Sequence, residues 1–228
     1  MHVSSKAALS CEDKSDIVFF GGGIGCGKSR NCLNIVMLTA LAKPNTVILY
    51  VPQPYPGKTA IVKVRDDIKQ SGLSALIDGD SQELSSIFVL NSGSTIVIAP
   101  HSNAIASLQG LTNTVDLVVI DEIGHDEDYF NAIIDHIRQS KSGTKLFFTA
   151  TAKTGSHLAK YSDSLGYEQV TFVEDLRISY FGSSVKDNPY LYSTDYAKMV
   201  DNLASDKSNP DSNLASGEWY SQKEIKCL

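Results

Sequence analysis

From residue 17 to residue 30 the chain reads IVFFGGGIGCGKSR, and residues 22–29 fit the pattern GxxxxGK[ST]. The apolar run 17–20 predicts a strand, and apolar spacing over 28–41 predicts a helix that the motif opens. Glycines allow the backbone N–H groups to approach phosphates, and the helix N-terminus favours negative charge. The alternative is a glycine-rich strand-to-helix turn with an incidental Lys-Ser pair. We expect a nucleotide-binding loop comprising Gly22, Gly23, Ile24, Gly25, Cys26, Gly27, Lys28, Ser29 and Arg30.

Acidic residues that follow a buried strand form the second half of the expected site. The run 117–120, LVVI, ends in Asp121 and Glu122. A carboxylate at the end of a buried strand is costly unless a cation or a donor meets it. We expect Asp121 and the Ser29 hydroxyl to hold Mg²⁺, Lys28 to reach the β- and γ-phosphates, and Glu122 to act as the catalytic base. The alternative is a pair of solvated acids at a strand end.

A third stretch, Thr149, Ala150 and Thr151, ends the apolar strand 145–149. In P-loop proteins with a catalytic glutamate, an additional strand lies between the phosphate-loop strand and the acidic strand. The hydroxyls at its tip would then sense the γ-phosphate, so we expect these three residues to couple nucleotide state to the rest of the chain. Ordinary capping of a strand by β-branched residues is the alternative.

Short apolar runs alternate with helical stretches, which is typical of a parallel sheet with crossover helices. We therefore predict an α/β fold, a P-loop NTPase of the additional-strand, catalytic-glutamate type, with a mainly parallel central sheet flanked by helices. The expected core covers 1–175 and a small C-terminal subdomain covers 176–228. The predicted elements are strands 17–20, 47–51, 87–90, 95–98, 116–120, 145–149 and 170–173, and helices 28–41, 61–76 and 129–138.

Composition excludes several classes of protein. The 228 residues include 20 Lys and Arg against 26 Asp and Glu, a formal net charge of −6, which argues against a surface that binds nucleic acid throughout. No apolar run approaches the roughly 20 residues that cross a bilayer, and the start lacks a signal-peptide core. We therefore expect no membrane association. Four cysteines and five histidines show no metal-ligand spacing, so we also expect no zinc.

Taken together, these motifs resemble the ATPase domain of the large terminase subunit, the DNA-packaging motor of tailed bacteriophages. The likeness is carried, besides the glycine stretch, by LNSGSTI at 90–96, SLQGLT at 107–112, DLVVIDE at 116–122, FFTAT at 147–151, DNPYL at 187–191 and GEW at 217–219.

The resemblance implies a Mg²⁺-dependent ATPase that moves double-stranded DNA into a procapsid. It implies portal protein and small terminase subunit as partners, a ring homo-oligomer when active, a monomer when isolated, and the host cytoplasm as location. Terminases continue into a nuclease domain beyond the GEW motif, so we expect no nuclease activity from these 228 residues.

The chain also departs from the family. Ile24 and Gln109 occupy positions where many or some members carry arginine, and no glutamine that could read adenine occurs before Gln53. An arginine finger accelerates P-loop enzymes by about 10³–10⁵. We expect an arginine to act in trans across a subunit interface, the candidates being Arg30, Arg65, Arg138 and Arg177.

Two alternative functions stay open: a superfamily-2-like helicase fragment, and a nucleotide-binding regulatory module with little turnover. For DNA contact, residues 136–162 contain five cations and no acid, which allows a phosphate-tracking surface or a merely solvated one. These cations are Arg138, Lys141, Lys145, Lys153 and Lys160.

Overall fold

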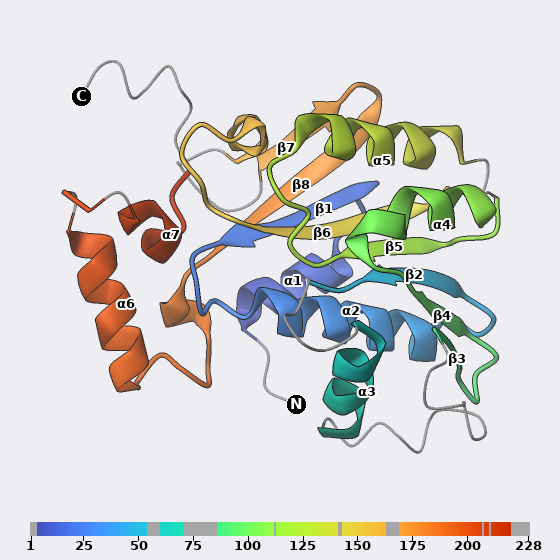
Figure 1. The fold of residues 1–228 in the computed structure, drawn as a ribbon, viewed down its shortest axis with the longest axis horizontal. Coiled ribbons are helices and arrows are strands. Elements are labelled where there is room, and N and C mark those ends of the chain that lie inside the picture. The colour runs from blue at the N-terminus through green and yellow to red at the C-terminus, as the bar shows by residue number, and fades with distance from the viewer. Residues whose placement is uncertain are drawn as a thin grey trace. The chain divides into compact units, whose positions relative to one another are not determined.

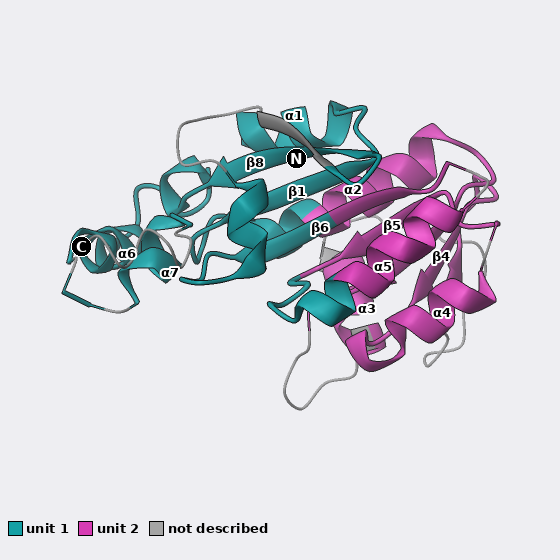
Figure 2. Cartoon of the chain, turned by 90° about the horizontal axis from the view of Figure 1, so that it is seen from above, with its two compact units in different colours: residues 1–31, 122–130, 148–228 teal, residues 32–121, 131–147 magenta. Residues whose placement is uncertain are grey.

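The computed structural model of the chain describes residues 4–53, 60–70, 86–111, 113–140, 143–162, 169–206, 208–209 and 211–219. The chain forms two compact units (Figure 2). Unit 1 comprises residues 1–31, 122–130 and 148–228, and unit 2 comprises 32–121 and 131–147. The sequence predicts a different division, into a core of residues 1–175 and a subdomain of residues 176–228, and that division stays a prediction.

Unit 2 contains one part of the sheet, with strands in the order β3-β4-β2-β5, followed by the first half of β6. β2 pairs in parallel with β4 and β5, and β3 pairs with β4 as an antiparallel hairpin. The strand bounds are β2 Val47–Val51, β3 Ile87–Val89, β4 Thr95–Ile98, β5 Leu117–Ile120 and β6 Lys145–Thr151.

Helices cover both faces of these strands, with α4 and α5 on one side and α2 and α3 on the other (Figure 1). β5 is buried at each of its four residues, as expected for a strand inside a parallel sheet. The helix bounds are α2 Lys28–Ala42, α3 Ala60–Gln70, α4 Ala104–Gly110 and α5 Glu127–Gln139, with the 3₁₀ turn η2 at His101–Asn103.

Unit 1 contains the rest of the sheet, in which the second half of β6 is followed by β1, β8 and β7. β1 pairs in parallel with β8, and β7 pairs antiparallel with β8. The bounds are α1 Ser5–Glu12, β1 Ile17–Gly22, η3 His157–Tyr161, β7 Gln169–Val173, β8 Leu176–Ser183, η4 Val185–Asp187, α6 Asp195–Ser205 and α7 Ser212–Ser216.

The predicted α/β class is confirmed, and β6 is the additional strand between β5 and β1. Strand β8 and helix α1 were not predicted. Leu176–Ser183 carries polar side chains inside the sheet: the Ser179 hydroxyl is buried and bonds the Ser15 hydroxyl at 2.6 Å. A strand whose polar groups are satisfied by a distant residue lacks the continuous apolar run that periodicity detects. The predicted helix 61–76 is described as far as Gln70.

The NSGS turn before β4 closes the C-terminal end of α2. The Ser92 hydroxyl donates to the Ala40 carbonyl at 2.8 Å, and the Ser94 hydroxyl donates to the Lys43 carbonyl at 2.9 Å. These bonds satisfy carbonyl groups that a helix end leaves without an intrahelical partner. This stretch, which carries part of the family likeness, therefore has a structural role here.

An aromatic cluster surrounds Phe19 of β1. The Phe19 ring, which is fully buried, lies 4.5 Å from Phe148, 4.9 Å from Tyr180 and 5.4 Å from Trp219 between centroids. Trp219 belongs to the GEW motif, so this packing connects the C-terminal part of unit 1 with its first strand. Among the described residues, no helix combines the length and apolar character required to span a bilayer.

Replacing Phe19 with alanine should lower the free energy of unfolding by about 3–5 kcal/mol, because it empties the centre of this cluster. Denaturant unfolding followed by circular dichroism measures the loss. Leu38→Ala is the control, since Leu38 is 49% exposed in α2 and should cost well under half as much. Equal losses for the two variants would contradict the central role of Phe19.

Candidate functional site

The glycine loop, residues 22–29, follows β1 and leads directly into α2. Gly25 and Gly27 have positive φ angles of 75° and 95°, which turn the backbone into a concave path. Among the described residues, the backbone N–H groups of Gly25, Cys26 and Gly27 donate to no protein acceptor. Consecutive N–H groups of this kind at the start of a helix, here one of 15 residues, are an arrangement that typically binds anions.

Lys28 lies over this loop rather than away from it. Its ammonium group donates to the carbonyls of Gly23 at 2.9 Å and Gly22 at 3.3 Å. Cys26 is buried, and burial raises the pKa of its thiol, so Cys26 adds no negative charge to the loop. Ser29 is exposed in the first turn of α2.

Glu122 lies in the same unit as the glycine loop and is held in an uncommon conformation, with φ of 60°. Its carboxylate accepts two hydrogen bonds from Thr151, one from the backbone N–H at 2.7 Å and one from the hydroxyl at 2.8 Å. Its own N–H donates to the Thr149 hydroxyl at 2.9 Å. The end of β6 therefore fixes both the backbone and the carboxylate of Glu122.

The same strand end also reaches the glycine loop. The N–H of Ala152 donates to the carbonyl of Gly22 at 3.2 Å, directly after Thr151. Of the residues predicted to couple nucleotide state, Thr149 and Thr151 contact Glu122, while Ala150 is fully buried. A displacement of the loop would thus act on the strand that holds the glutamate.

Asp121 follows β5 in unit 2 and is 3% exposed. Its N–H donates to the Val51 carbonyl at 2.8 Å, and its carbonyl lies 3.1 Å from His101 Nε2. His101 was not predicted from the sequence, because a lone histidine before a helix gives no motif.

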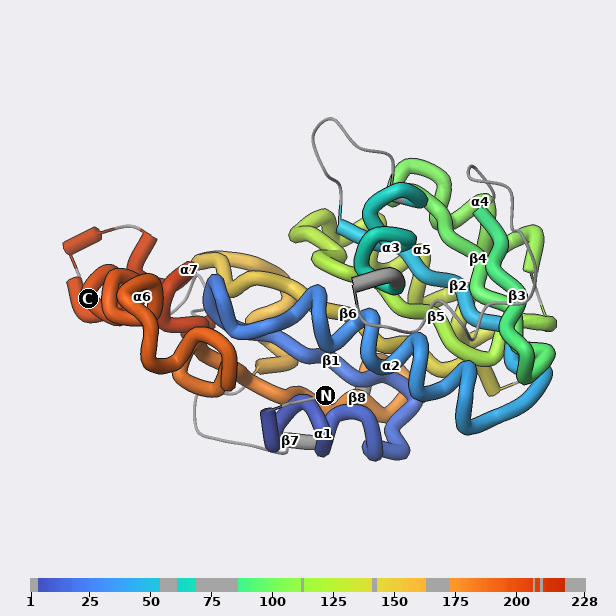
Figure 3. Tube along the Cα trace, turned by 90° about the horizontal axis from the view of Figure 1, so that it is seen from below, coloured from blue at the N-terminus to red at the C-terminus, as the bar shows by residue number. Residues whose placement is uncertain are grey.

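The C-terminal part of unit 1 packs against the glycine loop (Figure 3). The N–H of Ile24 donates to the Leu214 carbonyl at 2.8 Å. The Ile24 side chain packs against a small apolar cluster formed by Val185, Ala197, Val200 and Ala215. Ile24 therefore has a packing role in this chain.

The GEW and DNPYL motifs also lie at this loop, although their sequence did not indicate a role. Gly217 has φ of 79°, and a Cβ added there would lie 2.5 Å from the Gly23 nitrogen. Asn188 donates from its side-chain amide to the Gly25 carbonyl at 2.7 Å. The sequence did not predict the contacts of either motif with the loop, because the contacting residues are more than 160 positions apart in the chain.

Solved structures with a similar fold include large terminases of bacteriophages. The large terminase of a thermophilic bacteriophage aligns with a TM-score of 0.66 and 16% identity, covering 96% of this chain and 54% of that protein. The ATPase domain of the Thermus phage P74-26 large terminase aligns with a TM-score of 0.64 and 11% identity, covering 95% and 92%.

The chain has the fold of large terminase ATPase domains. The packaging motor of bacteriophage Phi-29 aligns less closely, with a TM-score of 0.57 and 12% identity over 93% of this chain and 67% of that one. The chain spans about half the length of the thermophilic bacteriophage terminase. No protein-family model and no curated protein sequence matches it.

Two of the described cations in the basic stretch 136–162 form ion pairs with acidic residues. Arg138 lies 3.6 Å from Asp135, and Lys160 lies 3.2 Å from Glu127. Lys153 is exposed just beyond β6. Lys141 lies outside the described residues. Whether this stretch binds DNA stays a prediction.

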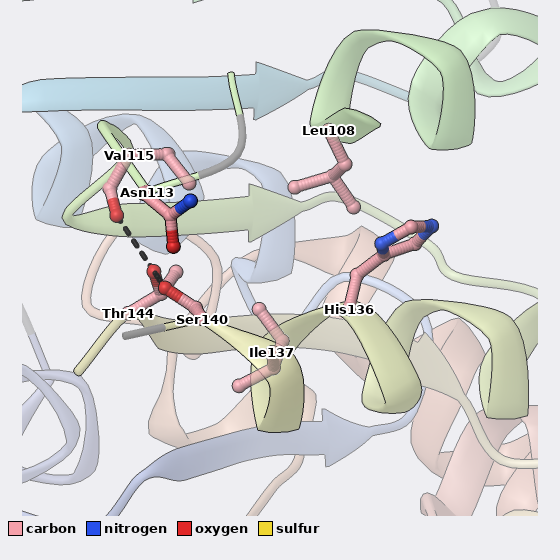
Figure 4. A pocket seen from close by; sticks show the side chains of 7 residues that line it. All are labelled: Leu108, Asn113, Val115, His136, Ile137, Ser140 and Thr144. Atoms are coloured by element: carbon pink, nitrogen blue, oxygen red, sulfur yellow. Dashed lines mark hydrogen bonds between the residues drawn. The ribbon is translucent and has the colours of Figure 1, made fainter. Parts of the chain in front are cut away.

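A small depression in unit 2 does not compete with the glycine loop as a ligand site (Figure 4). It lies before the start of β5, at the opposite end of that strand from Asp121, and holds only about 10 Å³, room for about one water molecule. The Thr144 hydroxyl at its edge donates to the Val115 carbonyl at 2.7 Å.

His125 follows Glu122 by three residues and is half-buried. Its Nδ1 lies 2.9 Å from the Ser156 hydroxyl, and its ring meets Trp219 edge-on at 6.2 Å. Burial lowers the pKa of His125 and Lys153 lowers it further, while Glu122 opposes the shift. The folded chain therefore favours neutral histidine.

Because the folded-state pKa is lowered, the unfolded chain binds this proton more readily, and stability falls as pH drops below the ordinary value of 6.5. Thermal unfolding of the wild type and His125→Gln between about pH 7.5 and 5.5 should show the wild type losing more stability. Parallel pH dependence of the two proteins would refute this expectation.

Proposed function

We propose that the chain is the ATPase motor domain of a large terminase, which hydrolyses ATP to drive double-stranded DNA into a procapsid. One observation carries this proposal. At the start of α2, beside Lys28, the backbone N–H groups of Gly25, Cys26 and Gly27 have no acceptor among the residues that the structure describes. This arrangement fits a polyphosphate, since it combines directed donors, a helix N-terminus and a cation. The shared fold of phage packaging ATPases supports the assignment.

ATP would bind with its β- and γ-phosphates in the glycine loop. Lys28 would leave the carbonyls of Gly22 and Gly23 for the phosphate oxygens, which are stronger acceptors because they are charged. The thermophilic bacteriophage terminase has been solved with ADP and with ATP-γ-S, which is consistent with a nucleotide here. Mg²⁺ would be held by the Ser29 hydroxyl and the Asp121 carboxylate and would offset the phosphate charge.

Glu122 would orient the attacking water and accept its proton. To do so its carboxylate must exchange at least one of the two bonds from Thr151 for the water. Because Ala152 is bonded to Gly22, a change in the glycine loop could shift the end of β6 and release the base. In this proposal Thr149 and Thr151 couple phosphate binding to catalysis.

The remaining parts of the proposal concern the assembly. We propose a ring of subunits in the host cytoplasm that docks on the portal with the small terminase subunit. An arginine from a neighbouring subunit would complete each site, with Arg30, Arg65, Arg138 and Arg177 as candidates. Arg30 is exposed beside Ser29, whereas Arg65 stacks on Phe88 at 5.0 Å.

A second candidate function is a regulatory module that binds ATP with little turnover. The paired bonds from Thr151 favour it, because a carboxylate with both oxygens engaged is a poor base. Turnover by the wild type distinguishes the two functions: a rate indistinguishable from buffer, with ATP bound, would favour the regulatory module.

Glu122→Gln should lower the maximal rate of ATP hydrolysis by about 10²–10⁴, because the general base is lost, while ATP affinity stays within a few-fold. Phosphate release at saturating ATP and equilibrium binding of ATP measure the two quantities. Glu127→Gln is the matched control, since Glu127 lies in unit 1, is exposed and pairs with Lys160. If both variants hydrolyse ATP like the parent, the assigned base and the motor proposal fail.

Lys153→Ala combined with Lys160→Ala should weaken the stimulation of ATP hydrolysis by double-stranded DNA without changing ATP affinity. The expected loss grows as salt is lowered, because phosphate contacts by lysine depend on counterion release. Hydrolysis with and without DNA at two salt concentrations tests this. Equal losses of stimulation and of ATP affinity would show that these lysines serve the nucleotide site or the surface instead.

A further inference from the structure

Asn188 of the DNPYL motif uses both ends of its side-chain amide, one of them on the glycine loop. Its Nδ2 donates to the Gly25 carbonyl at 2.7 Å, and its Oδ1 accepts the backbone N–H of Tyr190 at 3.0 Å. Exchanging the amide oxygen and nitrogen would make the oxygen face the Gly25 carbonyl and the NH₂ group face the Tyr190 N–H. Only one orientation of the amide therefore forms both hydrogen bonds. Asn188 therefore presents a fixed donor to the loop.

The contact to Gly25 also determines where the next N–H group points. A trans peptide is planar, with its C=O and N–H directed to opposite sides. The carbonyl of the Gly25–Cys26 peptide is held by Asn188, so the N–H of Cys26 faces the other way. That N–H is one of the three donors without a protein acceptor in the described chain.

The segment that carries Asn188 is itself firmly attached. The N–H of Asn188 donates to the Val185 carbonyl at 3.1 Å, and Val185 belongs to the apolar cluster against which Ile24 packs. The neighbouring Asp187 accepts a bond from Lys6 of α1 at 2.7 Å. Burial alone would raise the pKa of Asp187, but the bonds from Lys6 and the neighbouring backbone outweigh it and lower the pKa, so the carboxyl stays ionised. Asn188 thus has a stable support on two sides.

We infer that Asn188 is a positioning residue that orients the Cys26 N–H toward the phosphates of the bound nucleotide. This inference rests on the proposed function and deepens it, because it makes the turn after η4 part of the nucleotide site. Asn188 acts on the backbone of the loop and makes no hydrogen bond, among the described residues, to the base Glu122 or to the threonines that bond it. Its loss therefore affects nucleotide affinity and leaves the chemical step largely intact.

The test is Asn188→Asp, which keeps the size and the acceptor for Tyr190 but replaces the donor with a carboxylate oxygen facing a carbonyl. The dissociation constants for ADP and ATP, each with Mg²⁺, should both rise by about tenfold to a hundredfold. The maximal hydrolysis rate at saturating ATP should change less than about threefold. Asn188→Ala, which removes the donor without adding charge, should weaken binding in the same direction by a smaller factor.

Asn213→Asp is the matched control. Asn213 also donates from its side-chain amide within unit 1, but to the Thr154 hydroxyl at 2.6 Å, which can itself donate to a carboxylate. The affinity of the Asn213→Asp variant for ADP and ATP should match that of the wild type. Thermal unfolding by circular dichroism separates positioning from folding, since a merely structural role would lower the melting temperature and the active fraction rather than the affinity.

The possible outcomes distinguish failure of the inference about Asn188 from failure of the proposed ATPase function. A wild type that binds nucleotide, together with weakened affinity only in the Asn188 variants, supports the inference. Unchanged affinity in Asn188→Asp, or a loss explained wholly by unfolded protein, overturns the inference and leaves the ATPase proposal standing. A folded wild type that binds neither ADP nor ATP overturns the proposed function, and the inference with it.

Discussion

The close approach of backbone to backbone around Gly22 and Gly23 is the constraint on which the rest of the site depends. A Cβ added to Gly22 would overlap the Ser183 carbonyl oxygen at the end of β8, and one added to Gly23 would overlap the Ala215 carbonyl oxygen of α7. Because no side chain fits at either position, the backbone of the loop packs directly against the end of β8 and against α7. An array of N–H donors keeps its geometry only if the backbone that carries it cannot relax.

Glu122 illustrates a related principle. A left-handed conformation costs a non-glycine residue of the order of 1–2 kcal/mol, so it persists only where neighbours determine it. Here Thr149 and Thr151 supply three hydrogen bonds to one residue. The strain lies at Glu122, and the bonds that offset it come from the end of β6, which makes the position of the carboxylate sensitive to any movement of β6.

Local sequence patterns were sufficient to predict the apolar strands, the glycine loop that follows β1 and the two acidic residues that follow β5. Buried strands such as β1, β2 and β5 are visible because both of their faces require apolar residues. Strand β8 was missed because its buried Ser179 is satisfied by Ser15, a pairing that no local pattern reveals. The roles of Asn188, Leu214 and Gly217 were missed for the same reason, since each acts on the glycine loop across more than 160 residues.

The sequence by itself determined the α/β class, the glycine loop at the start of a helix, and the two acids after a buried strand, because these follow from short-range geometry and the burial of adjacent residues. Only the tertiary structure decided what surrounds them: that Thr151 engages Glu122, that Ile24 packs against an apolar cluster, and that Asn188 holds the Gly25 carbonyl. These contacts join segments distant in the chain, and their partners are selected by the folded backbone rather than by spacing along the sequence.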